Sequence, residues 1–163
     1  MVSPAILQGW SRETTLVRDA EGRWFHDGQP LDQRNLERAF DRWVGRADDG
    51  RYCLKNAINW AYITLHGAPF FVRAVRIEPG ERVVLLLSDD RLLPLRPASL
   101  RLDHVGALYC DAGDGMTARF DRHAAVQLEP LIAEDAQGIY LRLEGARVRP
   151  PVVDDPLQPV EQP

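Results

Sequence analysis

The sequence lacks the signatures of the common cofactor-dependent and hydrolytic enzymes. No GxxxxGK[ST], GxGxxG or GxSxG pattern occurs in its 163 residues, which argues against the usual ATPase, dehydrogenase and hydrolase designs. None of the four histidines, His26, His66, His104 and His123, is paired with another at HxH or HxxxH spacing. We therefore expect neither a metal site nor a cofactor.

Cysteine and lysine are also scarce. Cys53 and Cys110 lie far apart and form no CxxC, which predicts reduced, partly buried thiols rather than a zinc site or a disulfide framework. Lys55 is the only lysine, and the net charge of -4 argues against nonspecific binding to nucleic acid or to an anionic membrane.

Long apolar runs are missing as well. The longest aliphatic block, residues 83–87, is too short to span a bilayer. The amino-terminal region has no basic segment followed by a long apolar stretch. These two features predict a cytoplasmic protein with no membrane span.

The apolar residues that are present mostly alternate, which is typical of antiparallel sheet. "TLVRD" and "RWFHD" flank a glycine-containing turn at residues 20–22, and "WAYITL", "PFFVRAVRI" and "RVVLLLSD" follow as further strands. The unbroken "VVLLL" predicts a central strand covered on both faces. A last hairpin is expected to turn at Glu144 and Gly145.

Two segments show helical spacing instead. In the first, apolar residues recur every three or four positions, at Leu36, Ala39, Phe40, Trp43 and Val44. Asp32 is expected to be its N-cap, and Gly45 its C-cap. The second helix is expected in "DRHAAVQLEPLI", bent or ended by Pro130.

Together these patterns predict an α+β protein made of two small lobes of antiparallel sheet, with one amphipathic helix in each. The expected order is a flexible lead-in (1–14), an α+β lobe (15–67), a mostly β lobe with a helix (68–151) and a disordered proline-rich tail (152–163). "RWFHDG" and "ALYCDAGDG" share an aromatic strand and an Asp/Gly turn, which hints at an internal duplication.

Three segments carry a family resemblance. "GRWFHDGQPLDQRNLERAF", "DDGRYCL" and "ITLHGAPFFVRAV" resemble, in order and spacing, the bacterial domain-of-unknown-function family twelve-eighty-five (DUF1285). The later "LYCDAGDGMTARFDRHAAVQLEPLI" and "GIYLRLEGARVRP" fit it more loosely. The resemblance implies a duplicated α+β core, a carboxy-terminal lobe like a pleckstrin-homology domain, and a site for a nucleotide-like ligand between the lobes, with a signalling role.

The chain departs from that family in one polar run. Where the family typically has Thr-Pro-x-Glu after DGxYxL, this chain has Asn56-Ala57-Ile58-Asn59, followed by Trp60. We interpret Asn56, Asn59, Trp60 and Tyr62 as candidate ligand-binding residues, because binding sites combine apolar walls with a few polar groups.

Arginines supply the remaining candidates. Arg34, Arg38, Arg42 and Arg46 recur every four residues beside the apolar helical face, and Arg38 and Arg42 are included in the candidate site as anion-binding groups. The alternative is that Glu37 and Asp41 pair with Arg34 and Arg38 on a solvated face.

Three functions remain open. The favoured one is a non-enzymatic module that binds a peptide or a small molecule, the latter nucleotide-like or anionic, between its lobes. The second is a protein-interaction module without a ligand, which pairs with a protein partner through an exposed strand edge. The third is a small hydrolase that uses His26 or His66 with an aspartate as an acid–base pair.

Overall fold

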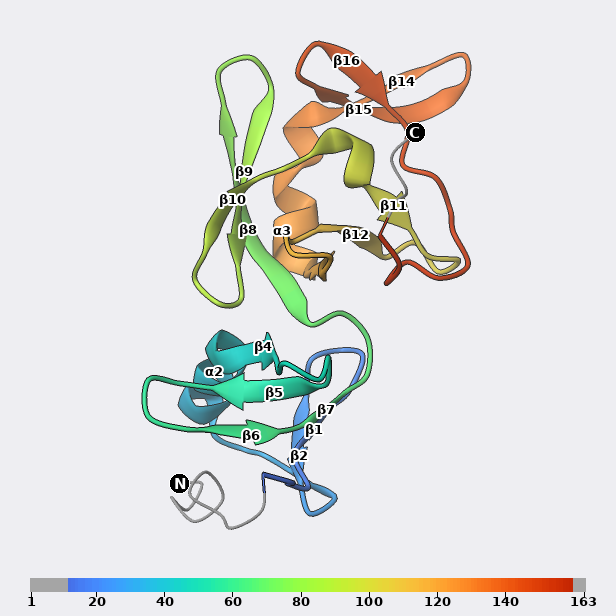
Figure 1. The fold of residues 1–163 in the computed structure, drawn as a ribbon. Helices are drawn as coiled ribbons and strands as arrows, with labels where there is room; N and C mark the ends of the chain where they lie inside the picture. Colours follow the sequence, from blue (N-terminus) through green and yellow to red (C-terminus); the bar gives the residue numbers. More distant parts are fainter. Residues whose placement is uncertain (1–11, 160–163) are drawn as a thin grey trace. The chain divides into compact units, whose positions relative to one another are not determined.

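The computed structural model describes residues 12–159. Residues 1–11 of the expected lead-in and 160–163 of the expected tail lie outside this range. The chain divides into two compact units, Met1–Pro69 (unit 1) and Phe70–Pro163 (unit 2) (Figure 1). The predicted α+β class is confirmed, and the described part of each unit contains one α-helix. Neither helix is long and apolar enough to cross a membrane.

Unit 1 contains two sheets and helix α2 (Arg34–Trp43). The first sheet has the order β3-β2-β1-β7, with strands β1 (Val17–Arg18), β2 (Trp24–His26), β3 (Gln29–Pro30) and β7 (Thr64–Leu65). The second has the order β4-β5-β6, with strands β4 (Val44–Arg46), β5 (Tyr52–Lys55) and β6 (Trp60–Tyr62). All pairs are antiparallel except β1 with β7, a parallel contact that strand patterns do not predict.

The turns around β2 explain the segment "RWFHDG". The predicted hairpin between β1 and β2 is confirmed by the pairing of Val17 with Phe25. Strand β2 then turns into β3 through a two-residue loop, Asp27 and Gly28, which have φ angles of 52° and 76°. Two consecutive positive φ angles are typical of a type I′ turn, whose twist matches the strands it joins.

Helix α2 has the predicted apolar face but different ends. The N-cap residue is Gln33 rather than Asp32, and it makes no side-chain capping bond. At the other end Val44 is already extended, and Gly45 lies inside β4 opposite Cys53. The predicted caps are therefore wrong, because pairing with β5 takes over the chain directly after Trp43.

A buried polar cluster joins the elements of unit 1. Arg18, with 0% of its surface exposed, donates from Nη1 to Asp41 Oδ1 at 3.0 Å and from Nη2 to the carbonyl oxygens of Ala68 (2.7 Å) and Pro69 (2.8 Å). Trp24 Nε1 donates to the same Asp41 oxygen at 2.9 Å. The expected surface pairing of Asp41 with Arg38 is wrong, because this carboxylate is buried in the core.

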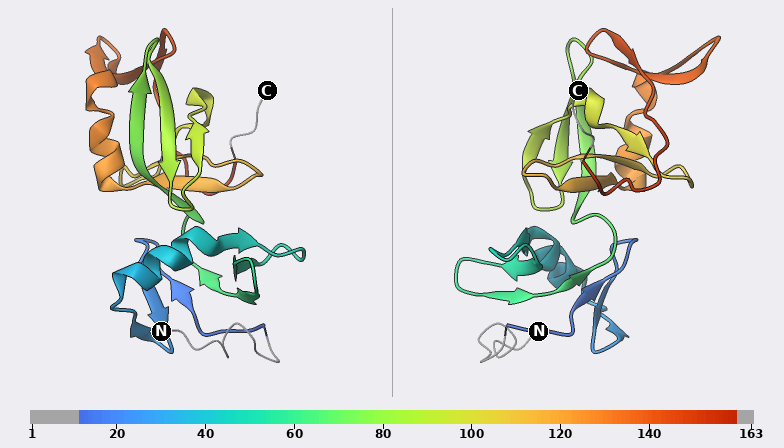
Figure 2. Two further views of the ribbon diagram at one scale, coloured as in Figure 1. Left: turned by 90° about the vertical axis from the view of Figure 1, so that its left-hand side faces the viewer. Right: turned by 45° about the vertical axis from the view of Figure 1, so that its right-hand side comes forward.

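Unit 2 is built on a six-stranded sheet with the order β10-β9-β8-β13-β12-β11 (Figure 2). Its strands are β8 (Phe70–Glu78), β9 (Arg82–Leu87), β10 (Leu92–Pro94), β11 (Arg101–Leu102), β12 (Leu108–Asp111) and β13 (Thr117–Phe120). A second, antiparallel sheet contains β14 (Ile132–Asp135), β15 (Gly138–Leu143) and β16 (Ala146–Val148). The short helices are η1 (Pro97–Ser99), α3 (Arg122–Gln127) and η2 (Glu129–Leu131).

Helix α3 packs against β8 and β13. The Asp121 carboxylate caps its first turn by accepting from the Ala124 N–H at 2.8 Å. The helix ends at Gln127 and Pro130 lies in η2, as the sequence predicts. The hairpin turn at Glu144 and Gly145 is also confirmed. The likeness of this unit to a pleckstrin-homology domain stays a prediction.

The proline-rich segment after β16 is held by polar groups of the six-stranded sheet. The Leu102 N–H donates to the Pro151 carbonyl at 2.8 Å. Arg101, which is 1% exposed, donates from Nε to the Pro156 carbonyl at 2.8 Å. Thr117 Oγ1 donates to the Leu157 carbonyl at 3.0 Å. Proline has no N–H to donate, but its carbonyl group can still accept, as those of Pro151 and Pro156 do here, so prolines are compatible with a packed path.

Replacing Asp41 by alanine removes the acceptor shared by Arg18 and Trp24. We expect the free energy of unfolding of unit 1 to fall by about 3–5 kcal/mol, the usual cost of leaving a buried charge without its partner. Urea denaturation followed by tryptophan fluorescence measures this, because all four tryptophans precede residue 70. The exposed Asp32→Ala is the control, with an expected change of about 0.5 kcal/mol or less. Equal losses in both variants would contradict the assignment.

Asp135 makes unit 2 sensitive to acid. Hydrogen bonds from Arg149, the backbone N–H of Gln137 and Arg147 lower the pKa of its carboxyl group from 3.8 to about 2. A carboxyl group with a lowered folded-state pKa stabilises the fold above its unfolded pKa, and this contribution is lost as the pH falls through the folded value. We therefore expect Asp135→Asn to be less stable than the wild type at pH 7.

The difference should shrink as the pH falls below about 4 and vanish below about 2. Thermal unfolding followed by circular dichroism across this range measures it. Asp114→Asn, at an exposed turn, is the control and should show no such trend. A difference between wild type and Asp135→Asn that stays constant with pH would contradict the prediction.

Candidate functional site

Two half-buried aromatic side chains lie together on β6. Trp60 and Tyr62 are two residues apart, so they emerge on the same face of the strand. Their rings meet edge to face, with centroids 5.0 Å apart and planes at 89°. Lys55 lies directly opposite Trp60 on β5, and Cys53 opposite Tyr62, so these two residues share that face. The opposite face carries Leu54 and Ala61, which are buried.

Two arginines cover the aromatic rings. The Arg12 Cζ lies 4.6 Å from the Trp60 ring centroid, and the Arg51 Cζ lies 3.7 Å from that of Tyr62. Both distances are within the range of cation–π attraction. We call the set Arg12, Arg51, Lys55, Trp60 and Tyr62 the aromatic–arginine surface.

The segment that carries Arg12 runs beside β6. The Tyr62 N–H donates to the Arg12 carbonyl at 2.7 Å, and Thr14 Oγ1 donates to the Tyr62 carbonyl at 2.6 Å. The Arg12 guanidinium donates from Nη1 to the Trp60 carbonyl at 2.6 Å and to Asn59 Oδ1. Asn59 thus fixes the position of Arg12 over the indole ring.

Asn56 shapes the loop between β5 and β6. Its Oδ1 accepts from the N–H groups of Ile58 and Asn59, both at 2.9 Å, and its own N–H donates to the Asn59 carbonyl at 3.0 Å. A side chain that accepts from backbone groups two and three residues ahead stabilises a tight turn. Asn56 therefore sets the loop that presents Asn59 and Trp60.

Acidic residues balance only one end of the surface. Glu13 accepts two hydrogen bonds from Arg51, at 2.7 and 2.9 Å, which lower the pKa of Glu13 and raise that of Arg51. Tyr62 donates to Asp49 Oδ2 at 2.6 Å, which lowers the pKa of Asp49 and raises that of Tyr62.

The other end of the surface keeps its positive charge. Within residues 12–159, Arg12 and Lys55 form no ion pair with an acidic side chain. Arg12 uses Nη1 for its two hydrogen bonds, one to a carbonyl and one to an amide oxygen, neither of which is charged. The surface is therefore cationic beside Trp60 and neutralised beside Tyr62.

The structure brings together only part of the candidate site. Asn59, Trp60 and Tyr62 converge, and Asn56 supports them from the adjoining turn. Arg38 and Arg42 lie elsewhere, exposed on α2. The arginines that reach the aromatic pair are instead Arg12 and Arg51, which the sequence analysis missed. The position of Lys55 opposite Trp60 depends on the register between β5 and β6, which the sequence alone does not specify.

The two candidate histidines of the hydrolase hypothesis lie apart from this surface. His26 Nε2 is 3.7 Å from Asp27 Oδ2, too far for a hydrogen bond. His26 ends β2, and Asp27 is the first residue of the type I′ turn that follows. His66 is exposed, and its backbone N–H donates to the Arg18 carbonyl. In the described part of the chain, no three His, Cys, Asp or Glu side chains are grouped to hold a metal ion.

Comparisons with known proteins support the fold. No protein-family model and no curated protein matches the sequence. A DUF1285 family protein from Silicibacter pomeroyi DSS-3 has a similar structure, with a TM-score of 0.60 and 18% identity over 98% of this chain and 90% of that chain. A DUF1285 family protein from Shewanella baltica OS155 has a TM-score of 0.51 and 18% identity over 69% of this chain and 87% of that chain. The resemblance to this family is confirmed at the level of the fold.

Replacing Tyr62 by phenylalanine removes the hydroxyl group that donates to Asp49. We expect the pKa of Asp49 to rise toward its ordinary value, because the hydrogen bond stabilises the charged carboxylate. An NMR titration of the side-chain carboxyl carbons measures it. Tyr52→Phe, on the opposite face of β5, is the matched control. An Asp49 pKa that is the same in Tyr62→Phe and wild type would contradict the assigned contact.

Proposed function

We propose, from the fold that this chain shares with the DUF1285 family proteins, that it is a divergent member of that family and a non-enzymatic binding module. Its ligand would be a small anionic, nucleotide-like molecule, held on the aromatic–arginine surface of unit 1. The observation that carries the proposal is the Arg12 guanidinium lying over Trp60, next to a lysine that has no acidic partner among the described residues.

A planar ring can stack on a guanidinium plane, and arginines that already lie on an aromatic ring are held ready for such stacking. Hydrogen bonds to Asn59 and to the Trp60 carbonyl fix the Arg12 plane before the ligand arrives. Less side-chain freedom is then lost on binding, which favours affinity. The base of a nucleotide would stack on Arg12 in this arrangement.

The charge distribution favours an anionic group at the same end. Lys55, opposite Trp60 in the sheet, would bind a phosphate or carboxylate as a point charge. Arg51 is less suited to this role, because both of its terminal nitrogens already bind the Glu13 carboxylate. The ligand would therefore lie over Arg12, Lys55 and Trp60 rather than over Tyr62.

The other candidate residues and the hydrolase hypothesis have less support. Arg38 and Arg42 would contribute only if the ligand extended to α2. A hydrolase that uses His26 or His66 would need a carboxylate within hydrogen-bond reach of the imidazole, and the distance of 3.7 Å between His26 Nε2 and Asp27 Oδ2 gives it little support. A signalling role would be compatible with binding without catalysis, because the ligand-bound state of the protein would then be the signal.

A thermal-shift assay tests the proposal. We expect adenosine or guanosine monophosphate at millimolar concentration to raise the melting temperature by several degrees, because a ligand at about 100 times its Kd adds about 2.7 kcal/mol of stability. Tryptophan fluorescence is the readout, since it reports unit 1. Inorganic phosphate and the free nucleosides, measured separately, distinguish the anionic from the planar contribution.

Variants locate the site. Arg12→Ala and Trp60→Ala should abolish the shift, and Lys55→Ala should weaken the response to the phosphate-containing ligands. Arg23→Ala, another exposed arginine of unit 1, should leave the ligand-induced shift unchanged. No response to any of these ligands, or a response that persists in both Arg12→Ala and Trp60→Ala, would refute the proposed site.

A further inference from the structure

Strand β8 has one unoccupied edge along its second half. On one side it pairs with β9 as far as Glu78, but on the other side β13 pairs only with Phe70, Phe71 and Val72. Beyond Val72, no described strand continues the sheet on that side. An open strand edge presents backbone donors and acceptors that another extended segment can bind.

The register shows which groups face this edge. Ile77 lies opposite Val83, whose carbonyl accepts from the Leu95 N–H on the far side of β9. Val83 therefore does not exchange hydrogen bonds with Ile77, because the backbone groups of one residue point to the same side of a strand. The N–H and carbonyl of Ile77 point away from β9, toward the open edge, as do those of Val75.

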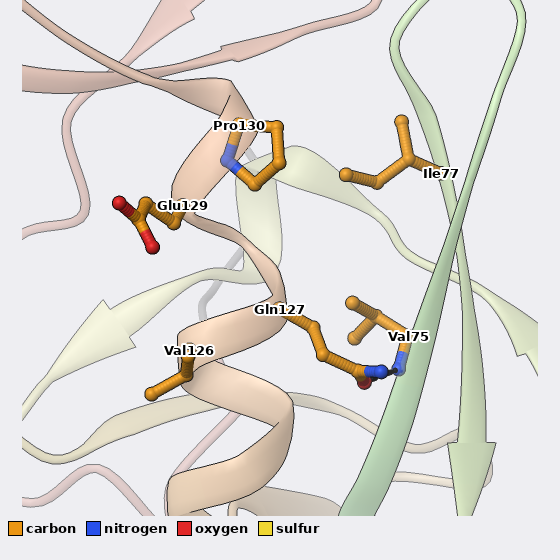
Figure 3. Close-up of a pocket in the computed structure, with 6 residues that line it drawn as sticks. All are labelled: Val75, Ile77, Val126, Gln127, Glu129 and Pro130. Carbon is orange, nitrogen blue, oxygen red and sulfur yellow. Dashed lines mark hydrogen bonds between the residues drawn. The ribbon is translucent and has the colours of Figure 1, made fainter.

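The open edge forms one wall of a groove of about 550 Å³. Val75 and Ile77 lie on the β8 side, and residues of α3 and η2 form the other side (Figure 3). Gln127 and Pro130 point toward β8, while the side chains of Val126 and Glu129, which also line the groove, point away from that strand. Ile77 and Val126 are 37% and 60% exposed, so the groove offers apolar surface beside backbone hydrogen-bonding groups.

A side chain already takes the place of one strand contact. The Val75 N–H donates to Gln127 Oε1 at 2.8 Å. A side-chain amide oxygen is the same kind of acceptor as a backbone carbonyl. Gln127 therefore occupies the position that the carbonyl of an added strand would take, while the Ile77 N–H has no such substitute among the described residues.

Glu129 gives the groove its charge. It is the one ionisable side chain among the six that line the groove, and within residues 12–159 it forms no ion pair. A cationic side chain on the bound segment would complement it. The outward N–H of Ile77, the apolar surface of the groove and the charge of Glu129 together favour an extended segment with apolar and basic side chains.

We infer that this groove binds an extended peptide segment of a partner protein, which pairs by strand addition with the Val75 carbonyl and the Ile77 N–H of β8, beside the bond from the Val75 N–H to Gln127. The segment places alternate apolar side chains against Val75, Ile77 and Pro130, and a lysine or arginine against Glu129. Main-chain hydrogen bonds provide affinity, and the alternate side chains provide selectivity. This site lies within unit 2 and does not depend on the ligand proposed for unit 1.

Selection of random peptides displayed on phage against the full chain tests the inference. We expect enriched peptides to combine alternating apolar residues with a basic residue. Their binding should weaken about tenfold in Ile77→Pro, which removes the outward N–H but none of the bonds to β9, and in Val126→Arg, which repels the basic residue. Val105→Arg, at an exposed apolar residue outside the groove, should bind like the wild type.

Amide hydrogen exchange distinguishes strand pairing from loose binding, because a loosely bound peptide would not slow the exchange of the Ile77 amide. In the free protein the Ile77 amide should exchange much faster than those of Arg76 and Glu78, which face β9. A bound peptide should slow the Ile77 amide at least about tenfold, as pairing within a sheet does. Circular dichroism confirms that Ile77→Pro and Val126→Arg are folded.

Three results would overturn the inference. The first is no enriched peptide, and the second is equal binding of enriched peptides to the wild type, Ile77→Pro and Val126→Arg. The third is a wild-type chain that dimerises while Ile77→Pro stays monomeric, because the occupant of the edge would then be a second copy.

Discussion

The ion pair between Arg18 and Asp41 is the constraint on which the arrangement of unit 1 depends. One guanidinium reaches a carboxylate on α2 and two carbonyl groups at residues 68 and 69, while the indole of Trp24 shares the same carboxylate oxygen. Strands β1 and β2, the helix and the end of the unit are thereby fixed relative to one another. A buried charge tolerates few other geometries, since each unmet donor or acceptor is costly.

A buried arginine has a similar role in unit 2, where it joins different elements. Arg101, on an outer strand of the six-stranded sheet, is almost completely buried and binds Asp111, the Thr117 hydroxyl and the carbonyl groups of Ser99 and Pro156. In both units an arginine satisfies backbone carbonyl groups in segments that lie outside regular sheet pairing. A planar cation with five donors suits this use, because several acceptors can be reached from one side chain.

Sequence periodicity predicts the elements of this fold better than their ends and partners. The apolar face of α2 and the turns at Asp27 and at Glu144 follow from local patterns, since they depend on nearby residues. The caps of α2 do not, because the pairing of Val44 with Leu54 is a contact between distant residues. The buried position of Asp41 likewise cannot be predicted from nearby residues. Its spacing from Arg38 favours a surface pair, and only the fold brings Arg18 to it. The parallel pairings β1–β7 and β8–β13 are hidden for the same reason.

The candidate site also combines features that follow from nearby residues with contacts between distant ones. This changes how the polar run at residues 56–59 is interpreted. Trp60 and Tyr62 were predicted to belong to one site, and their rings are in contact, but the arginines that cover them come from residues 12 and 51. Asn56 and Asn59 use their side-chain oxygens on backbone groups and on Arg12. Under the proposed function, a change in this run would therefore act on recognition indirectly, by altering the loop and the arginine that the loop holds. Two proteins that share these strands can then present different surfaces, because the loop determines which cation lies over Trp60.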